Sequence, residues 1–391
     1  MKTRKRHTGT RLVHAGKDQA GYVGKAVNPP LVRASTVVFD SMQDWQDMRK
    51  RRSSERLFTY GARGTPTTFA LEDMVTELEG GYRTRLYPTG LAAIAMVFLS
   101  YLRPGDHVLI SDCTYLPVRA LGTEFLAAYG ISYSFFSAQH TDLSDLVQSN
   151  TRMVYVESPG SLVYEMLDLP ALAAFTRERN LLLVADNTWG SGVLYHPLAL
   201  GADISVMAAT KYLGGHSDVM MGTVCTQQTH WDPLNRMSEA LGMTVSPDDA
   251  WLVLRGIRSL RARLQMHQQH AEQVLQWLSE QKVVSQLFSP VLPQDPGHTL
   301  WQRDCQGGNG LLSFAVAGVS EQRVIAMLDA LQLFGLGASW GGYESLAALA
   351  DLSTARSQTD WSASGPIVRL HIGLEDPEDL IADLEQAFQH L

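Results

Sequence analysis

The sequence predicts an α/β protein with a mostly parallel sheet in a large domain, followed by a smaller C-terminal α+β domain. Short apolar runs alternate with helical stretches from Leu91 onward, an order of elements typical of such a sheet. The runs are apolar throughout, as in strands that helices cover on both faces. Near Ala250 this pattern changes to one long helical stretch and a shorter mixed region. The length of 391 residues is sufficient for two domains and an N-terminal arm.

The elements of the large domain follow from the local residue pattern. The apolar run Leu91–Leu102 predicts a buried helix, because it is well short of the ~20 residues that a membrane span needs. The other predicted helices are Pro117–Ala128, Leu143–Gln148 and Leu169–Arg179. The predicted strands are His107–Ser111, Ile131–Phe136, Met153–Glu157, Leu181–Asp186, Ile204–Ala208 and Gly222–Thr226.

The smaller C-terminal region follows a long predicted helix that runs from Pro247 to about Gln281. Strands are expected near Leu311–Ala317 and Ile367–Ile372. Asp376 is a suitable N-cap for the last helix, with a proline after it and apolar residues at four-residue spacing. We therefore predict an N-terminal arm at 1–60, a large domain at 61–255 and a small domain at 256–391.

Composition and charge argue against several classes of protein. The net charge of −8 disfavours non-specific nucleic-acid binding, and no apolar stretch suits a membrane protein. The basic segment Met1–Arg6 is not followed by an apolar stretch, so no secretory signal is expected. The three cysteines are scattered and lack metal spacing. We therefore expect reduced thiols, no bound metal and a cytoplasmic location.

Basic residues cluster between Lys2 and Arg63, most densely at Arg49–Arg52. One interpretation is a patch that binds a polyanion. The favoured one is a solvated arm that lies on an acidic neighbouring subunit.

Two charged residues stand at the ends of predicted strands, where parallel sheets place their ligands. Lys211 follows the strand Ile204–Ala208, and an isolated charge there must be paired or lose its proton. A Schiff base with an aldehyde would remove this cost, whereas the alternative is a lysine that points to solvent. Asp186 either caps the turn that follows it or pairs with the ring nitrogen of a cofactor.

A third feature is the helix start at Thr89-Gly90-Leu91, whose backbone N–H groups could hold a phosphate. By itself this signal is weak, because many helices begin in this way. Taken together, the three features resemble the Cys/Met-metabolism family of enzymes that depend on pyridoxal 5′-phosphate (PLP). The resemblance covers nearly the whole chain, in order, on the segments Asn28-Pro29-Pro30, Tyr60-Gly61, Leu78-Glu79-Gly80-Gly81, Thr89-Gly90, Tyr115, Glu157-Ser158-Pro159-Gly160, Asp186-Asn187-Thr188, Ala209-Thr210-Lys211-Tyr212-Leu213-Gly214-Gly215-His216-Ser217-Asp218, Ser339-Trp340-Gly341-Gly342-Tyr343-Glu344-Ser345 and Arg369-Leu370-His371-Ile372-Gly373-Leu374-Glu375.

The resemblance implies the aminotransferase-like fold (fold type I) with PLP as the cofactor. Lys211 would hold the cofactor covalently and then act as the acid and base at the α-carbon of an amino-acid substrate. Asp186 would pair with the ring nitrogen, and Tyr115 would stack on the ring face.

The same resemblance implies a phosphate site. The N–H groups of Gly90 and Leu91 and the hydroxyl of Thr210 would bind the phosphate. Tyr60 would reach the phosphate of the neighbouring subunit. The active species would therefore be a homo-oligomer of dimers with shared sites, expected to be a tetramer.

The substrate side is implied by a second group of residues. Arg369 would clamp the substrate's α-carboxylate through two parallel hydrogen bonds, a geometry that lysine cannot reproduce. Ser339 and Trp340 would line the pocket. Trp340 favours β-elimination, because γ-lyases and γ-synthases of the family usually carry a smaller aliphatic residue at this point.

The chain departs from the family pattern at the specificity end of the site. The phosphate motif Tyr-x-Arg has Ala62 at its arginine position, while Arg63 matches a second arginine that β-lyases direct to the distal end of the substrate. One guanidinium would then serve either the phosphate or the substrate. Ala120 and Ala338 stand where an acid and a tyrosine are expected.

The predicted activity is that of a PLP-dependent carbon–sulfur β-lyase. It would cleave L-cystathionine, or a related cysteine S-conjugate, to a thiol (homocysteine), pyruvate and ammonia. The alternatives are a γ-lyase or γ-synthase of the same family and a broad cysteine-conjugate lyase. A binding or regulatory protein that has lost turnover is disfavoured by intact Lys211, Asp186 and Arg369.

Overall fold

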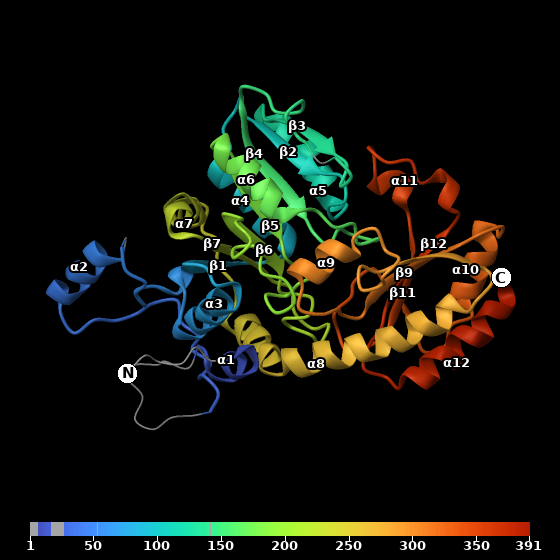
Figure 1. Ribbon diagram of the computed structural model, residues 1–391. Helices are drawn as coiled ribbons and strands as arrows, with labels where there is room; N and C mark the ends of the chain where they lie inside the picture. Colours follow the sequence, from blue (N-terminus) through green and yellow to red (C-terminus); the bar gives the residue numbers. More distant parts are fainter. Residues whose placement is uncertain (1–6, 17–26, 53, 141) are drawn as a thin grey trace.

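The computed structural model describes residues 7–16, 27–52, 54–140 and 142–391, and it confirms the predicted α/β class (Figure 1). The larger sheet has seven strands in the order β1-β7-β6-β5-β4-β2-β3. Its last five strands in this order run parallel, whereas β7 is antiparallel to both β1 and β6. The strands are β1 (Arg83–Tyr87), β2 (His107–Ser111), β3 (Ser132–Phe136), β4 (Thr151–Glu157), β5 (Leu182–Asp186), β6 (Ile204–Ala208) and β7 (Gly222–Thr226).

The central strands are buried on both faces, as their unbroken apolar runs predict. Along β4, Met153 and Tyr155 pack in the hydrophobic cluster that contains helix α4 (Gly90–Tyr101). Val154 and Val156 point the other way, into the cluster that contains helix α6 (Leu169–Glu178). Since successive side chains of a strand point to opposite faces, only helices on both faces can cover such a strand.

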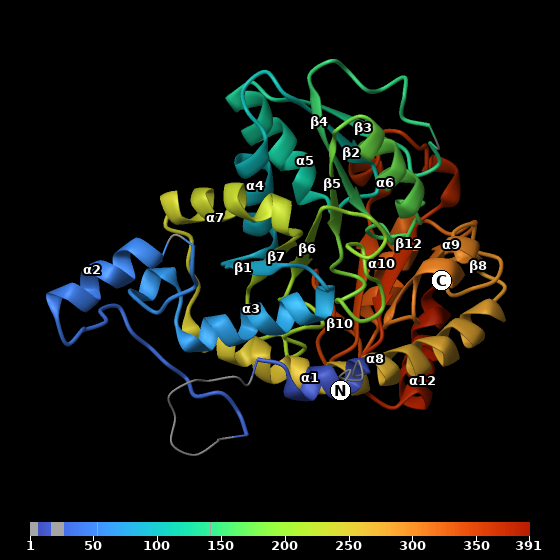
Figure 2. The ribbon, with the colours of Figure 1, turned by 60° about the vertical axis from the view of Figure 1, so that its left-hand side comes forward.

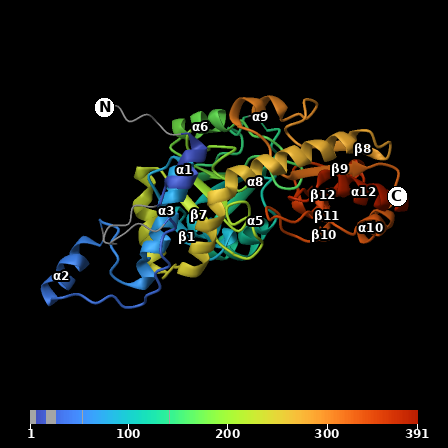
Figure 3. The ribbon, with the colours of Figure 1, turned by 90° about the horizontal axis from the view of Figure 1, so that it is seen from below.

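One long helix, α8 (Pro247–Ser279), connects the two halves of the molecule. Its 33 residues extend about 50 Å at the usual helical rise, and Figure 3 shows it running beneath the molecule. The predicted domain boundary at residue 256 lies within this helix. The other helices are α1 (Thr8–His14), α2 (Met42–Arg51), α3 (Pro66–Glu79), α5 (Pro117–Ala120), α7 (Trp231–Ala240), α9 (His298–Asp304), α10 (Glu321–Asp329), α11 (Leu352–Ala355) and α12 (Pro377–Ala387).

The smaller C-terminal sheet has five strands in the order β10-β11-β12-β9-β8. It is antiparallel except where β10 pairs with β11. The strands are β8 (Val284–Phe288), β9 (Leu311–Val316), β10 (Gly335–Leu336), β11 (Leu346–Ala350) and β12 (Ile367–His371). Helix α12 begins as predicted, because the carboxylate of Asp376 accepts the backbone N–H of Glu378.

Two predicted helices differ from the structure. The helix predicted at Leu143–Gln148 is wrong, because this segment forms turns. Six residues close only about two intrahelical hydrogen bonds, too few to offset nucleation, and Asp142 accepts the N–H of Ser144 instead. The helix predicted at Pro117–Ala128 is divided into α5, a π-helical turn at Leu121–Leu126 and a 3-10 turn at Ala127–Tyr129.

In the N-terminal arm, Leu12 of α1 is buried in the core of this subunit, whereas α2 is not packed on it. Helix α2 has no buried residue and stands away from the rest of the molecule (Figure 2). The basic residues from Lys2 to Arg6 lie outside the described residues. Within the described ranges, no helix has the length and apolar character needed to cross a membrane.

Candidate active site

A pocket of about 310 Å³ opens where β4, β5 and β6 end and helix α4 begins. It brings together seven of the residues that the sequence singles out, from segments far apart in the chain. Its lining residues are Thr89, Gly90, Leu91, Ile94, Tyr115, Glu157, Ser161, Asp186, Thr188, Ala208, Thr210, Lys211, Met220 and Trp340. The carboxyl ends of parallel strands therefore form the candidate site, as the sequence predicts.

Lys211 points into this pocket and does not extend to solvent. Its Nζ donates a hydrogen bond to the Ser339 hydroxyl at 2.7 Å and lies 5.1 Å from the centre of the Trp340 ring. Burial, and then the positive charge of Arg369, lower the pKa of Lys211 to about 8. A useful fraction of the amine is therefore neutral near physiological pH and able to attack an aldehyde.

Asp186 is a buried carboxylate that lacks a cationic partner. It accepts hydrogen bonds from the Thr188 N–H at 2.9 Å, the Thr188 hydroxyl at 2.5 Å and the Tyr155 hydroxyl at 3.2 Å. No basic side chain within the described part of the chain lies at ion-pair distance from it. Burial raises the pKa of Asp186, against the effect of these hydrogen bonds. It caps the following turn, but its environment also suits a cation placed in the pocket.

The N-terminus of α4 forms a cradle for an anion. Thr89 caps the helix by accepting the Ala92 N–H at 3.0 Å, and this leaves the N–H groups of Gly90 and Leu91 at the pocket. A Cβ at position 90 would lie 2.8 Å from the Cβ of Ala208, so the close approach requires glycine. The Thr210 hydroxyl lies opposite and exchanges hydrogen bonds with the backbone of Met221.

Tyr115 lies at the mouth of the pocket with 46% of its surface exposed. Its backbone N–H donates to Glu157 at 2.6 Å. Burial, followed by the charges of Glu157 and Asp186, raises the pKa of Tyr115. The phenol of Tyr115 is thus protonated and uncharged at neutral pH. It can cover an aromatic ring without adding a negative charge beside it.

Glu157 is a pocket residue to which the sequence analysis assigned no role. It is buried beside Asp186 in the β4–β5 register, and burial followed by the charge of Asp186 raises its pKa well above the usual range. Ser161 and Thr188 also line the pocket without a predicted role. Glu157 and Asp186 carry the same signal in the sequence, an acid at the end of an apolar strand, so Glu157 was open to prediction.

The predicted substrate residues come together on the side of the smaller sheet. Arg369, on β12, donates to the carbonyl oxygens of Gly337, Ala338 and Ser339. Its Nε–H is buried and has no partner in the structure, so it remains a donor for a carboxylate. Ala338 itself is exposed, and so is Ala120 at the end of α5.

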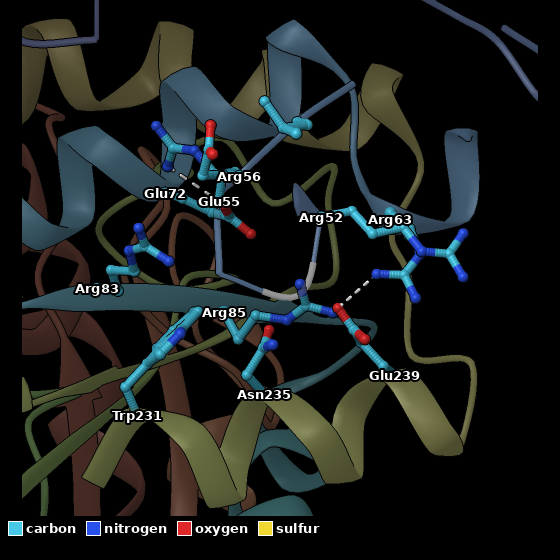
Figure 4. A pocket seen from close by; sticks show the side chains of 11 residues that line it. Arg52, Glu55, Arg56, Arg63, Glu72, Arg83, Arg85, Trp231, Asn235 and Glu239 are labelled. Atoms are coloured by element: carbon cyan, nitrogen blue, oxygen red, sulfur yellow. Dashed lines mark hydrogen bonds and ion pairs between the residues drawn. The ribbon is translucent and has the colours of Figure 1, made fainter. Parts of the chain in front are cut away.

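Tyr60 and Arg63 do not reach this pocket. Tyr60 is 50% exposed and pairs with Thr36 in an isolated bridge. Arg63 follows in the short 3-10 helix η1 (Gly61–Arg63) and forms an ion pair with Glu239 of α7 at 2.8 Å (Figure 4). These two residues of the predicted phosphate motif therefore lie apart from Lys211 within one subunit.

PLP fits the pocket on three observations of this structure. Lys211 offers an amine with a lowered pKa. The buried carboxylate of Asp186 lacks the cation that a protonated pyridine nitrogen would supply. The start of α4 offers backbone donors for a phosphate. In the part of the chain that the structure describes, no group of three or more potential ligand side chains could hold a metal ion.

Comparison with known proteins places the chain in a family. The family model of Cys/Met metabolism PLP-dependent enzymes matches residues 9–389, and the chain belongs to this family. Its cofactor is PLP, and its fold is the aminotransferase-like fold type I.

Several individual proteins are similar along the full length. A protein named cystathionine beta-lyase from Bordetella avium is 49% identical over 390 residues, covering 98% of each chain. Cystathionine beta-lyase MetC from Escherichia coli is 40% identical, again with 98% of each chain covered. The solved structure of metB from Corynebacterium glutamicum superposes with a TM-score of 0.87 at 31% identity and covers 98% of both chains.

Proposed function

We propose that the chain is a carbon–sulfur β-lyase that cleaves L-cystathionine, or a related cysteine S-conjugate, to a thiol, pyruvate and ammonia. The proposal rests on the position of the Lys211 amine. It lies in the PLP pocket and contacts Ser339 and Trp340, the residues expected to line the substrate side. This is the position from which one group can serve both the cofactor and the substrate's α-carbon. The β-lyase names of the similar proteins support the same reaction.

When bound, PLP supplies an electron-withdrawing ring that stabilises negative charge at the α-carbon of the substrate. Asp186 would hold a proton on the ring nitrogen, because a carboxylate buried without another cation strongly favours a positive partner. Tyr115 would cover the ring and limit access of water. The N–H groups of Gly90 and Leu91 would hold the phosphate and so orient the cofactor.

Arg369 and Lys211 act on the substrate itself. The free Nε–H of Arg369 binds the α-carboxylate and turns the α-proton toward Lys211. The amine of Lys211, which its lowered pKa leaves partly neutral, would take that proton at Nζ. The electron pair left behind expels the thiolate from the β-carbon, and the Lys211 ammonium is placed to return a proton. Subsequent addition of water to the three-carbon fragment yields pyruvate and ammonia.

We further propose that the active species contains at least two subunits with shared sites, as in a tetramer of two such dimers. The support is that Tyr60 and Arg63 lie away from the pocket of their own subunit. The projecting helix α2, which buries no residue in its own subunit, also suits a contact with a neighbour. A cytoplasmic location is proposed as well, since the three cysteines are unpaired.

The main alternative is γ-elimination by an enzyme with the same fold and cofactor. Trp340, whose ring centre lies 5.1 Å from the Lys211 amine, supports β-elimination, because γ-lyases and γ-synthases of the family usually carry a smaller aliphatic residue at this point. The released keto acid distinguishes the reactions, because β-elimination of cystathionine yields pyruvate and γ-elimination yields 2-oxobutyrate. A panel of cysteine S-conjugates, including L-cystathionine, should release pyruvate. Release of 2-oxobutyrate alone would contradict the proposal.

A further inference from the structure

A cleft beside Arg63 gathers more positive charge than its own carboxylates balance (Figure 4). It lies where the end of α2, β1 and α7 meet, and its volume is about 40 Å³. Such a space holds about three water molecules, and hence one small polar group but not a whole amino acid. The charged lining residues are Arg52, Arg56, Arg63, Arg83 and Arg85 with Glu55, Glu72 and Glu239.

Every glutamate of this cleft already has an arginine partner. Glu55, Glu72 and Glu239 pair with Arg51, Arg56 and Arg63 at 2.5, 3.4 and 2.8 Å, respectively. Arg52, Arg83 and Arg85 have no carboxylate at ion-pair distance among the described residues. The cleft therefore has an excess of guanidinium groups.

Arg52 and Arg63 crowd around the single carboxylate of Glu239. Burial, then the like charges of Arg63 and Arg49, lower the pKa of Arg52, and Glu239 opposes the effect. The side chains of Arg63 and Glu239 are only 25% and 26% exposed, so water screens the repulsion incompletely. An anion with paired oxygens would relieve the repulsion, because a guanidinium binds carboxylate or phosphate through two parallel N–H groups.

The PLP pocket, in contrast, lacks positively charged groups for the phosphate. Its phosphate donors, Gly90, Leu91 and Thr210, are all neutral, and no arginine is among the described lining residues. Lys211 is required for the aldehyde. A phosphate dianion would thus have no guanidinium partner among the described residues that line the pocket, and the position at which the family pattern supplies one from the neighbour is Ala62.

We propose that Arg52 and Arg63 form an oxyanion site in which the ligand competes with the carboxylate of Glu239 and Arg52 supplies the guanidinium that Ala62 lacks. The ligand is an oxyanion group presented by the neighbouring subunit, either the phosphate of its PLP or a carboxylate at the distal end of its substrate. The inference rests on the proposed β-lyase with shared sites. It assigns Arg52 to binding of the oxyanion and Glu239 to competition with it.

The test compares Arg52→Gln with the matched control Arg49→Gln in the full-length protein. Arg49 lies on α2, three residues before Arg52, stacks on Trp45 at 4.7 Å and does not line the cleft. Two readouts separate the two sources of the oxyanion. The first is the dissociation constant of PLP from the apoprotein, followed by absorbance. The second is the ratio of kcat/KM for L-cystathionine to that for S-methyl-L-cysteine, which has no distal carboxylate.

Arg52→Gln should weaken PLP about ten-fold if the ligand is the phosphate, or lower the substrate ratio about ten-fold if it is the distal carboxylate. Arg49→Gln should change neither. Glu239→Gln removes a competing negative charge and keeps a hydrogen-bond acceptor, so the affected quantity should move in the opposite direction. Arg52→Lys should restore part of the loss, which a merely structural role of the guanidinium would not predict.

The proposal is overturned if Arg52→Gln and Arg49→Gln agree in both readouts, or if Glu239→Gln and Arg52→Gln change them in the same direction. Thermal unfolding of each variant shows whether it is folded. If Arg52→Gln is not folded, the two readouts are compared between Arg52→Lys and the wild-type protein instead. If wild-type protein releases no keto acid from any cysteine conjugate, the proposed function fails. The PLP dissociation constants still test the oxyanion site in that case.

Discussion

The lowered pKa of Lys211 predicts how the apoprotein acquires its cofactor. Only the neutral amine attacks the aldehyde of PLP, so the rate of covalent attachment should rise with pH and level off above the pKa of Lys211, about 8. At pH 7 roughly one-tenth of such an amine is neutral, about 300 times more than for a lysine of ordinary pKa. The structure attributes this difference first to burial and then to Arg369.

This can be tested with Arg369→Gln, which removes the positive charge that helps to lower the pKa of Lys211 and leaves the burial of the amine unchanged. The midpoint of the rate profile should move to higher pH, so that attachment at pH 7 becomes slower while the limiting rate at high pH is retained. Arg303→Gln is a suitable control. It removes one positive charge from an exposed arginine of α9 that pairs with Asp168 and Asp304.

The assay is stopped-flow absorbance of the apoprotein mixed with PLP from about pH 6 to about pH 11, a range that includes both the lowered pKa of Lys211, about 8, and the ordinary lysine value. A wild-type midpoint close to that of a free lysine would refute the assigned burial of the amine. An unchanged midpoint in Arg369→Gln would refute the electrostatic contribution of Arg369.

Three further outcomes test the rest of the site. Asp186→Asn should retain PLP yet slow exchange of the α-proton by ~100-fold or more, because an amide cannot stabilise the ring cation. A normal exchange rate in this variant would mean that Asp186 only caps the turn that follows it. Tyr60→Phe protein mixed with Lys211→Ala protein should regain activity through hybrid sites if each alone is impaired, whereas a fully active monomer at nanomolar concentration would contradict shared sites. Because alanine stands at positions 120 and 338 of the distal pocket, wild-type protein should prefer a less polar cysteine conjugate to L-cystathionine, and a wide preference for cystathionine in steady-state kcat/KM would contradict this. Since Arg52 is proposed to replace the missing guanidinium, Ala62→Arg should tighten PLP mainly in the Arg52→Gln background.

Much of the fold was predictable because its signals are local. The strands β2, β6 and β7 begin and end at the predicted residues, since a five-residue apolar run bounded by polar residues is typical of a buried strand. The start of α4 at Gly90 follows from its Thr89 cap. The failure at Leu143–Gln148 came from a segment too short for its weak helical pattern to compete with turns.

The candidate site was predictable to the extent that it lies at strand and helix ends. Lys211, Asp186 and Gly90 each carry a signal next to an element boundary, and parallel strands bring such boundaries to one edge. Glu157 carries the same signal as Asp186. Only the tertiary structure shows that Glu157 lies beside Asp186 in the strand register, where burial and then the charge of Asp186 raise the pKa of Glu157.

The remaining features depend on contacts between distant parts of the chain. The sequence determines that Lys211 follows a buried strand, but only the tertiary structure places Ser339 against its amine, 128 residues further on. It also decides that Arg63 pairs with Glu239, 176 residues away, instead of entering the pocket of its own subunit. Charge–charge and burial energies depend on separation in space and on exclusion of water, and neither quantity is encoded in the spacing of residues along the chain.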